Sequence, residues 1–83
     1  MRITSPAMLA QALRAARKRH DLTQSAAAST VGIKQATVSA FENNPDKARL
    51  ETLFKLLASL DMELHLADRG EKTDAGQNWD QEW

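Results

Sequence analysis

The sequence predicts a mainly α-helical domain in which four short helices are followed by a single β-strand. Three observations carry this expectation. Apolar residues recur at three- and four-residue spacing in four segments, each bounded by a capping residue, a glycine or a proline. The period then changes to two over residues 62–67, which is typical of a half-buried strand. Beyond it, residues 68–83 hold no aliphatic side chain except Ala75, a composition that favours a disordered acidic tail.

A first helix is expected from Pro6 to about Arg19. Ser5 can accept a hydrogen bond from a free amide of the first turn, and proline is favoured at the first helical position. The apolar face of this helix is formed by Leu9, Ala12, Leu13 and Ala16. Its last turns carry the basic residues Arg14, Arg17, Lys18 and Arg19. These suit a helix C-terminus, a phosphate backbone or simply solvent, so they are not assigned to a site.

A second, short helix is expected from Gln24 to about Val31, with Thr23 as its N-cap. Three consecutive alanines at residues 26–28 favour the helix and allow another helix to approach closely. Gly32 fits the left-handed position that commonly follows a helix. The sequence therefore predicts a tight turn at this glycine.

A third helix is expected from near Lys34 to about Glu42, with Val38 and Phe41 on its apolar side. The segment Asn43–Asp46 ends it for two reasons. Asparagine tolerates the left-handed conformation, and the residue before proline is disfavoured in a helix.

The fourth helix has the widest apolar face, which consists of Leu50, Leu53, Phe54, Leu56, Leu57 and Leu60. The strand that follows alternates Met62, Leu64 and Leu66 with more polar residues. A single strand leaves its backbone groups unpaired, so we expect it to pair with the same strand of a second subunit across a two-fold axis. These three residues are then dimerisation residues. The alternative is that residues 62–66 extend the fourth helix.

Composition narrows the function classes. The formal net charge is zero, but residues 1–41 carry +5 and residues 42–83 carry −5, which suggests a polyanion-facing surface and a separate acidic segment.

The chain has no cysteine, and its two histidines have no metal-ligand spacing, so no metal or cofactor is expected. No nucleophile–base pair can be assembled, so an enzyme is not expected. No apolar run is long enough to span a membrane, and a soluble cytoplasmic protein is expected. A chain of 83 residues buries a small core, which favours oligomerisation.

Residues 23–43 have the layout of a helix-turn-helix, whose second helix enters the DNA major groove. That helix is expected to expose Lys34, Gln35, Ala36, Thr37, Ser39 and Ala40. Glutamine can bond adenine N6 and N7 together, lysine can reach guanine, and Ala36 or Thr37 can contact the thymine methyl group. Lys34 stands where Ser, Thr, Asp or Asn would cap the helix better, which indicates a functional role.

The Thr23-Gln24 pair that opens the second helix and the turn at Gly32 resemble the Cro/lambda-repressor (Xre-type) helix-turn-helix family. More narrowly, residues 23–25, 32–37 and 41–46 resemble the HipB-type antitoxins. The single strand and the Glu-Trp ending are also similar. The resemblance implies a lambda-repressor-like four-helix domain in a homodimer that represses its own toxin–antitoxin operon. It also implies operator DNA and a HipA-like serine/threonine kinase toxin as partners. A free-standing phage-type repressor without a toxin is the alternative, and an adaptor that has lost DNA binding is a third hypothesis.

The resemblance also implies residue roles. Lys34, Gln35, Ala36 and Ser39 match base-reading positions, whereas Thr23 and Gln24 match contacts to phosphate or backbone; Gln24 as a mere helix cap is the alternative. Trp83 would dock on the toxin, and Trp79 is a second aromatic anchor in the tail. Residues 1–67 would then form the DNA-binding domain with its dimerisation strand, and residues 68–83 the tail. The sequence departs from the family at Ala26, where glutamate is common, and at Ala27, where leucine is usual.

Overall fold

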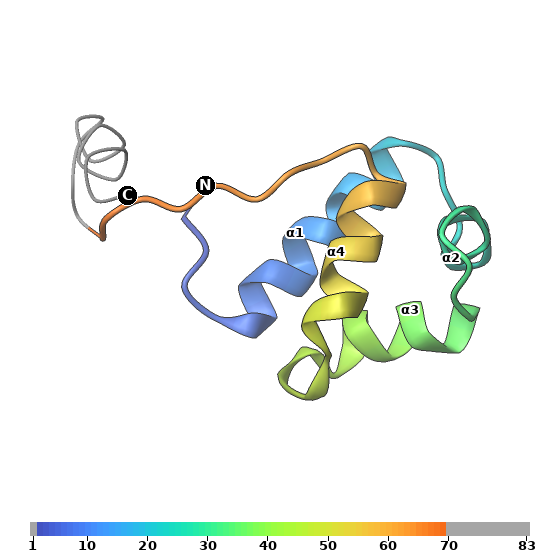
Figure 1. Cartoon of the computed structure of the whole chain (residues 1–83), viewed down its shortest axis with the longest axis horizontal. Helices are drawn as coiled ribbons and strands as arrows, with labels where there is room; N and C mark the ends of the chain where they lie inside the picture. Colours follow the sequence, from blue (N-terminus) through green and yellow to red (C-terminus); the bar gives the residue numbers. More distant parts are fainter. Residues whose placement is uncertain (1, 70–83) are drawn as a thin grey trace.

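Four α-helices and one short 3₁₀ helix lie in the part of the chain that the computed structural model describes, residues 2–69. In chain order they are α1 (Pro6–Arg19), α2 (Gln24–Thr30), α3 (Gln35–Asn43), η1 (Pro45–Lys47) and α4 (Leu50–Ser59). Figure 1 shows α2 nearly end-on while α3 lies across the view, so these two helices cross steeply. The predicted helical architecture is confirmed, and the ends of α1, α2 and α3 lie within about one residue of their expected places.

Two of the helices begin with the predicted side-chain caps. The Ser5 hydroxyl accepts a hydrogen bond from the Met8 amide at 3.2 Å, and the Thr23 hydroxyl accepts one from the Ala26 amide at 3.0 Å. At the start of α3, Lys34 occupies the N-cap position without a side-chain cap bond. The sequence expectation of an uncapped third helix is therefore confirmed.

Three helices end in the same way, with a residue in the left-handed conformation. These residues are Asp21 after α1 (φ 57°), Gly32 after α2 (φ 71°) and Asp61 after α4 (φ 55°). In each case the next amide donates to the carbonyl five residues back, as in the bond from Met62 to Leu57 of 2.8 Å. With this hydrogen-bonded turn α4 ends at Ser59, so the alternative that residues 62–66 extend the fourth helix is wrong.

The end of α3 differs in detail from the prediction. The helix includes Asn43, and Asn44 has φ −142° and ψ 56°, which is not left-handed. The expectation from asparagine is therefore wrong, and the steric effect of Pro45 on the residue before it accounts for the helix end. Pro45 then opens η1, a turn that the sequence analysis did not predict.

The core lies where α1, α3 and α4 meet, and α2 closes one end. Its buried apolar residues are Ala10, Leu13, Ala16, Ala28, Val38, Phe41, Leu53, Leu56, Leu57 and Leu60. The predicted face of α1 is rotated by about one residue, because Ala10 and Arg17 are buried while Leu9 and Ala12 are only half-buried. Ala27 is fully buried, so the small side chain occupies an interior position. No helix among residues 2–69 is long and apolar enough to cross a membrane.

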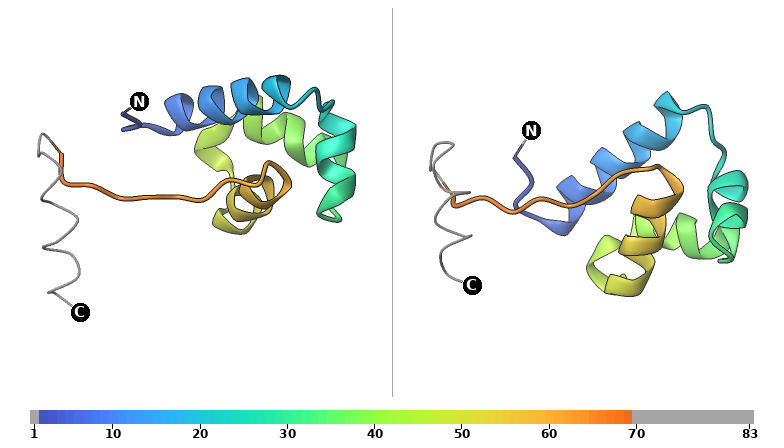
Figure 2. Two further views of the ribbon diagram at one scale, coloured as in Figure 1. Left: turned by 90° about the horizontal axis from the view of Figure 1, so that it is seen from above. Right: turned by 45° about the horizontal axis from the view of Figure 1, so that its top comes forward.

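The predicted strand at residues 62–67 is not formed in the single chain, and residues 2–69 contain no β-strand. Instead this segment leaves α4 and runs away from the helices as extended, exposed chain (Figures 1 and 2). A strand requires a hydrogen-bonded neighbour, and no backbone hydrogen bond joins residues 63–67 to another described segment. Leu66 is 71% exposed here, and on α4 Leu50 is 73% and Phe54 is 53% exposed. Part of the predicted apolar face of the fourth helix therefore lies on the surface.

Candidate nucleic-acid interface

The first turn of α3 presents polar and small side chains to solvent. Lys34, Gln35 and Ala36 are exposed, whereas Thr37 and Ser39 are half-buried. The opposite side of the helix is fixed in the core by Val38 and Phe41, which are 0% and 3% exposed. The amphipathic pattern therefore holds α3 by one face and leaves the predicted base-reading residues on the other.

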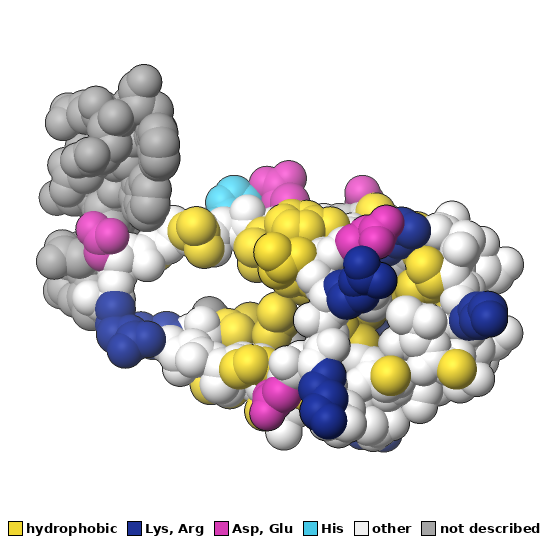
Figure 3. All heavy atoms as spheres, turned by 60° about the horizontal axis from the view of Figure 1, so that its bottom comes forward, with side chains coloured by type: hydrophobic (Ala, Val, Ile, Leu, Met, Phe, Trp, Pro, Cys, Tyr) yellow, Lys and Arg dark blue, Asp and Glu magenta, His cyan; other side chains and the backbone are white. Residues whose placement is uncertain are grey.

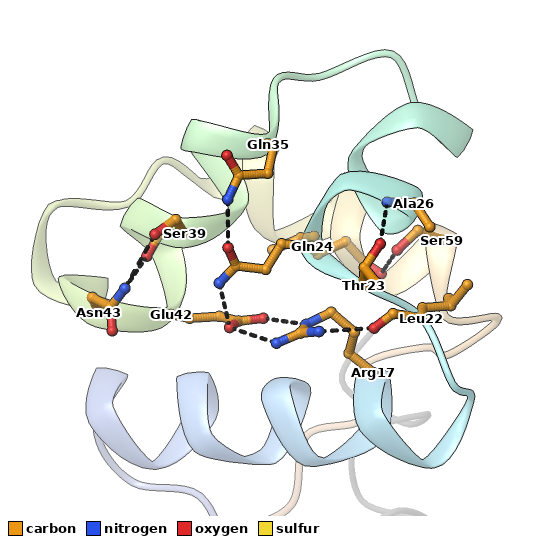
Figure 4. Close-up of polar contacts among 11 residues, drawn as sticks. Arg17, Leu22, Thr23, Gln24, Ala26, Gln35, Ser39, Glu42, Asn43 and Ser59 are labelled. Carbon is orange, nitrogen blue, oxygen red and sulfur yellow. Dashed lines mark hydrogen bonds and ion pairs between the residues drawn. The ribbon is translucent and has the colours of Figure 1, made fainter.

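Beneath α3 lies a buried ion pair that the sequence analysis missed (Figure 4). The Arg17 Nε donates to Glu42 Oε2 at 2.7 Å and its Nη2 donates to Oε1 at 3.1 Å, while Nη1 donates to the Leu22 carbonyl at 2.7 Å. The two side chains are only 11% and 5% exposed. The interpretation of Arg17 as a surface charge for phosphate or solvent is therefore wrong, since its guanidinium joins α1 to α3 and to the turn between α1 and α2.

The ion pair keeps Glu42 charged. Burial alone would raise the pKa of this carboxyl group, but hydrogen bonds from Arg17 and Gln24 and the positive charges of Arg17 and Arg14 outweigh it. The pKa of Glu42 therefore lies below its ordinary value of 4.5. At neutral pH the site holds a carboxylate, which can only accept hydrogen bonds.

Gln24 connects this carboxylate to the exposed surface. Its Nε2 donates to Glu42 Oε1 at 3.0 Å, and its Oε1 accepts from Gln35 Nε2 at 2.6 Å (Figure 4). The alternative that Gln24 only caps α2 is wrong, because the Thr23 hydroxyl is the capping acceptor. The structure thus brings two predicted site residues, Gln24 and Gln35, into direct contact.

Ser39 lies one turn further along α3. The Asn43 side-chain amide donates to the Ser39 carbonyl at 2.9 Å and to its hydroxyl oxygen at 3.2 Å. The hydroxyl oxygen accepts this bond and keeps its own hydrogen available as a donor. Such a hydroxyl suits a phosphate or a base acceptor in the groove.

Two basic residues beside α3 were not among the predicted site residues. Lys47 in η1 and Arg49 at the start of α4 are exposed, and they line a shallow groove together with Ala36 and Ala40 of α3. They lie in the net acidic half of the sequence, which concealed them. Their position shortly after the second helix of the helix-turn-helix motif could have identified them from the sequence.

Three of the other predicted site residues, Met62, Leu64 and Leu66, lie away from this surface, on the extended segment beyond α4. Trp79 and Trp83 lie outside the described residues.

Comparison with known proteins agrees with this geometry. The helix-turn-helix family matches residues 13–66. Antitoxin HipB of Escherichia coli O6:H1 is 45% identical over 83 residues, which cover 99% of this chain and 88% of that protein. Antitoxin HipB of Escherichia coli K12 is 49% identical over 67 residues, 81% of this chain and 76% of that protein. A chain in the solved HipA–HipB–O2–O3 complex superposes with a TM-score of 0.80 and 48% identity, covering 82% of this chain and 96% of that one. This chain therefore belongs to the helix-turn-helix family and, within it, to the HipB antitoxins.

Proposed function

We propose that this protein is a sequence-specific DNA-binding repressor that acts as an antitoxin and regulates its own operon. The observation that carries the proposal is the exposed polar turn of α3, which is braced from beneath by the network of Arg17, Glu42 and Gln24. A helix held in this way can enter the major groove with its N-terminal residues at the base edges. In this proposal the chain binds and does not catalyse.

The proposed DNA contacts fall into two groups. Lys34, Gln35, Ala36, Thr37 and Ser39 face the bases. Thr23 and Gln24, at the start of α2, face the phosphate backbone, and we add the exposed cations Lys47 and Arg49 to this second group. Phosphate contacts position the protein, whereas the side chains of α3 supply sequence preference.

A HipA-like kinase toxin is the proposed protein partner. HipB has been solved in a complex with HipA and O2–O3, and the chain compared there is 48% identical to this one. In this proposal the tail of residues 68–83 contributes Trp79 and Trp83 as aromatic anchors for the toxin, a role supported by the resemblance to the HipB-type antitoxins for Trp83 and by the tail composition for both. Membership among the HipB antitoxins favours this function over that of a free-standing phage-type repressor. Such a protein would work in the cytoplasm at the nucleoid.

We further propose a homodimer formed through residues 62–67. The extended segment offers unpaired backbone groups, and Met62, Leu64 and Leu66 are 38%, 45% and 71% exposed. Figure 3 shows hydrophobic side chains gathered around an opening in the molecule, and a groove of about 990 Å³ is lined by Ile3, Leu9, Leu64 and Leu66 among others. Pairing this segment with its two-fold copy would satisfy the backbone and cover the apolar side chains.

Footprinting on the DNA upstream of the operon tests the proposed DNA contacts. Gln35→Ala should lose preference at one or two base pairs, at a cost of roughly 1–3 kcal/mol, while nonspecific binding changes little. Gln11→Ala, which changes an exposed glutamine on α1, is the matched control. A footprint that is identical for Gln35→Ala and the wild type would disprove the base-reading role.

Co-purification with the product of the neighbouring gene tests the toxin partner. Deletion of residues 81–83 should weaken that complex without affecting operator binding. If no kinase-like protein is encoded beside this gene, the free-standing repressor becomes the better explanation.

A further inference from the structure

We propose that Glu42 is a positioning residue that fixes the direction of the Gln35 amide, so that Gln35 reads adenine in preference to guanine. Glu42 does not itself face the DNA, because its side chain is only 5% exposed beneath α3. It acts through Gln24, which lies between the two. The inference rests on the proposed DNA-binding function, in which Gln35 reads a base edge, and adds to it the buried residue that orients the Gln35 amide.

The first step is set by the chemistry of the carboxylate. An ionised Glu42 can only accept hydrogen bonds, and Arg17 holds both of its oxygens in place with bonds of 2.7 and 3.1 Å. The end of the Gln24 amide that lies 3.0 Å from Oε1 must therefore be the NH₂ group. The reverse orientation would place two acceptor oxygens against each other, at a buried position that water reaches poorly.

The second step transmits this direction to the surface. With its NH₂ group on Glu42, Gln24 must turn its Oε1 toward α3. The end of the Gln35 side chain that lies 2.6 Å away must then be its NH₂ group. Gln35 therefore donates one N–H to Gln24, and its own Oε1 and second N–H remain available to a ligand.

The third step matches these free groups to a base edge. In the major groove adenine presents a donor at N6 beside an acceptor at N7, whereas guanine presents acceptors at both O6 and N7. An amide that offers one acceptor and one donor is complementary to adenine, and its oxygen is opposed to guanine O6. An exposed glutamine whose amide is not held by a neighbour could turn its NH₂ group outward and bind either purine. Here a turn of the Gln35 amide would break its bond to Gln24, and a compensating turn of Gln24 would break the bond to Glu42.

Operator selection provides the test. Full-length wild-type protein is used to select 20-bp duplexes from a random library, and each A·T pair of the preferred duplex is then changed to G·C. At the pair whose preference disappears in Gln35→Ala, we expect the wild type to favour adenine about 5- to 150-fold, the range for one good bidentate contact. In Glu42→Gln the ratio should fall below about 3-fold, because an amide at residue 42 can present either an acceptor or a donor to Gln24.

Two further variants separate positioning from a general loss of stability. Gln24→Met breaks the relay, which is the chain of hydrogen bonds from Glu42 through Gln24 to Gln35, without altering the ion pair. It should lower the adenine-to-guanine ratio as far as Glu42→Gln does. The double variant should show no additional loss, because both changes act on one path. Glu51→Gln is the charge-matched control, since it neutralises an exposed carboxylate on α4, and it should keep the wild-type ratio. If Glu42→Gln fails to fold, the Arg17→Met/Glu42→Met variant takes its place, because it removes the Glu42 carboxylate without leaving an unpaired buried charge, and it should lower the ratio as far.

The relay can also be observed in the free protein. Side-chain amide hydrogen exchange by NMR should show Gln24 and Gln35 protected in the wild type, and both should lose protection in Glu42→Gln. Folded Glu42→Gln or Gln24→Met that retains the full ratio would overturn the positioning role while leaving DNA binding intact. A wild-type protein that selects no sequence at all would overturn the proposed function, and this inference with it.

Discussion

Replacing Arg17 with methionine gives the sharpest test of the described structure. Methionine keeps much of the aliphatic length that packs against the core, but it removes the guanidinium. The change eliminates two bonds to Glu42, of 2.7 and 3.1 Å, and the bond to the Leu22 carbonyl of 2.7 Å. What remains is a carboxylate that is 5% exposed and has lost its charge partner.

The magnitude follows from that burial. Removing one partner of a buried ion pair costs about 3–5 kcal/mol, because an uncompensated charge is left behind. An exposed pair would lose about 0–1 kcal/mol. Since the free energy of unfolding of native proteins is about 5–15 kcal/mol, loss of the buried ion pair removes a large part of the total stability. The Arg17→Met/Glu42→Met double variant eliminates both charges, so we expect it to be more stable than Arg17→Met alone.

Urea unfolding followed by helical circular dichroism measures both variants, at one protein concentration because self-association adds to stability. The pH dependence provides a second readout. In the wild type the pKa of Glu42 is lowered on folding, so its contribution is complete above pH 4.5 and is lost as the pH falls below that value. In Arg17→Met the effect of burial, which raises the pKa, is no longer outweighed by Arg17. Its deficit relative to the wild type should therefore shrink in acid. A loss below about 1 kcal/mol at pH 7 with no pH dependence would refute the buried pair.

Other predictions concern the helix ends and the extended segment. Gly32→Ala should destabilise the protein by about 1–2 kcal/mol in thermal unfolding; an added Cβ meets nothing within 4 Å, so the cost comes from the left-handed backbone alone. Asp61→Gly should instead raise stability by up to about 1 kcal/mol, because glycine adopts φ 55° without strain, and Asp61→Ala should not. Leu66→Lys should weaken the dimer in sedimentation experiments while helical content is preserved; an unchanged dimer would remove residues 62–67 from the interface.

The helices were predictable because their signals are local. Ser5, Thr23 and Gly32 act within a few residues of where they stand, and the spacing of apolar residues reports burial along one element. The strand depends on a contact that is not local, because residues 62–67 form no strand within one chain and would need a hydrogen-bonded neighbour such as the proposed second subunit. The exposure of Leu50 and Phe54 was not predictable either, since periodicity shows that one side of a helix is apolar but not whether the domain's own core covers all of it.

The network beneath α3 shows a different limit of sequence reasoning. Arg17 and Glu42 are 25 positions apart, and each has an ordinary local explanation, as a charge near a helix C-terminus and as a polar residue near a helix end. The pair also belongs to opposite halves of the charge division, so the +5 of residues 1–41 counts a cation that never faces DNA. The −5 of residues 42–83 conversely hides Lys47 and Arg49, which lie beside α3. Charge along the sequence therefore predicts a polyanion-binding surface, but the packing of the helices decides which cations are buried and which are exposed to form it.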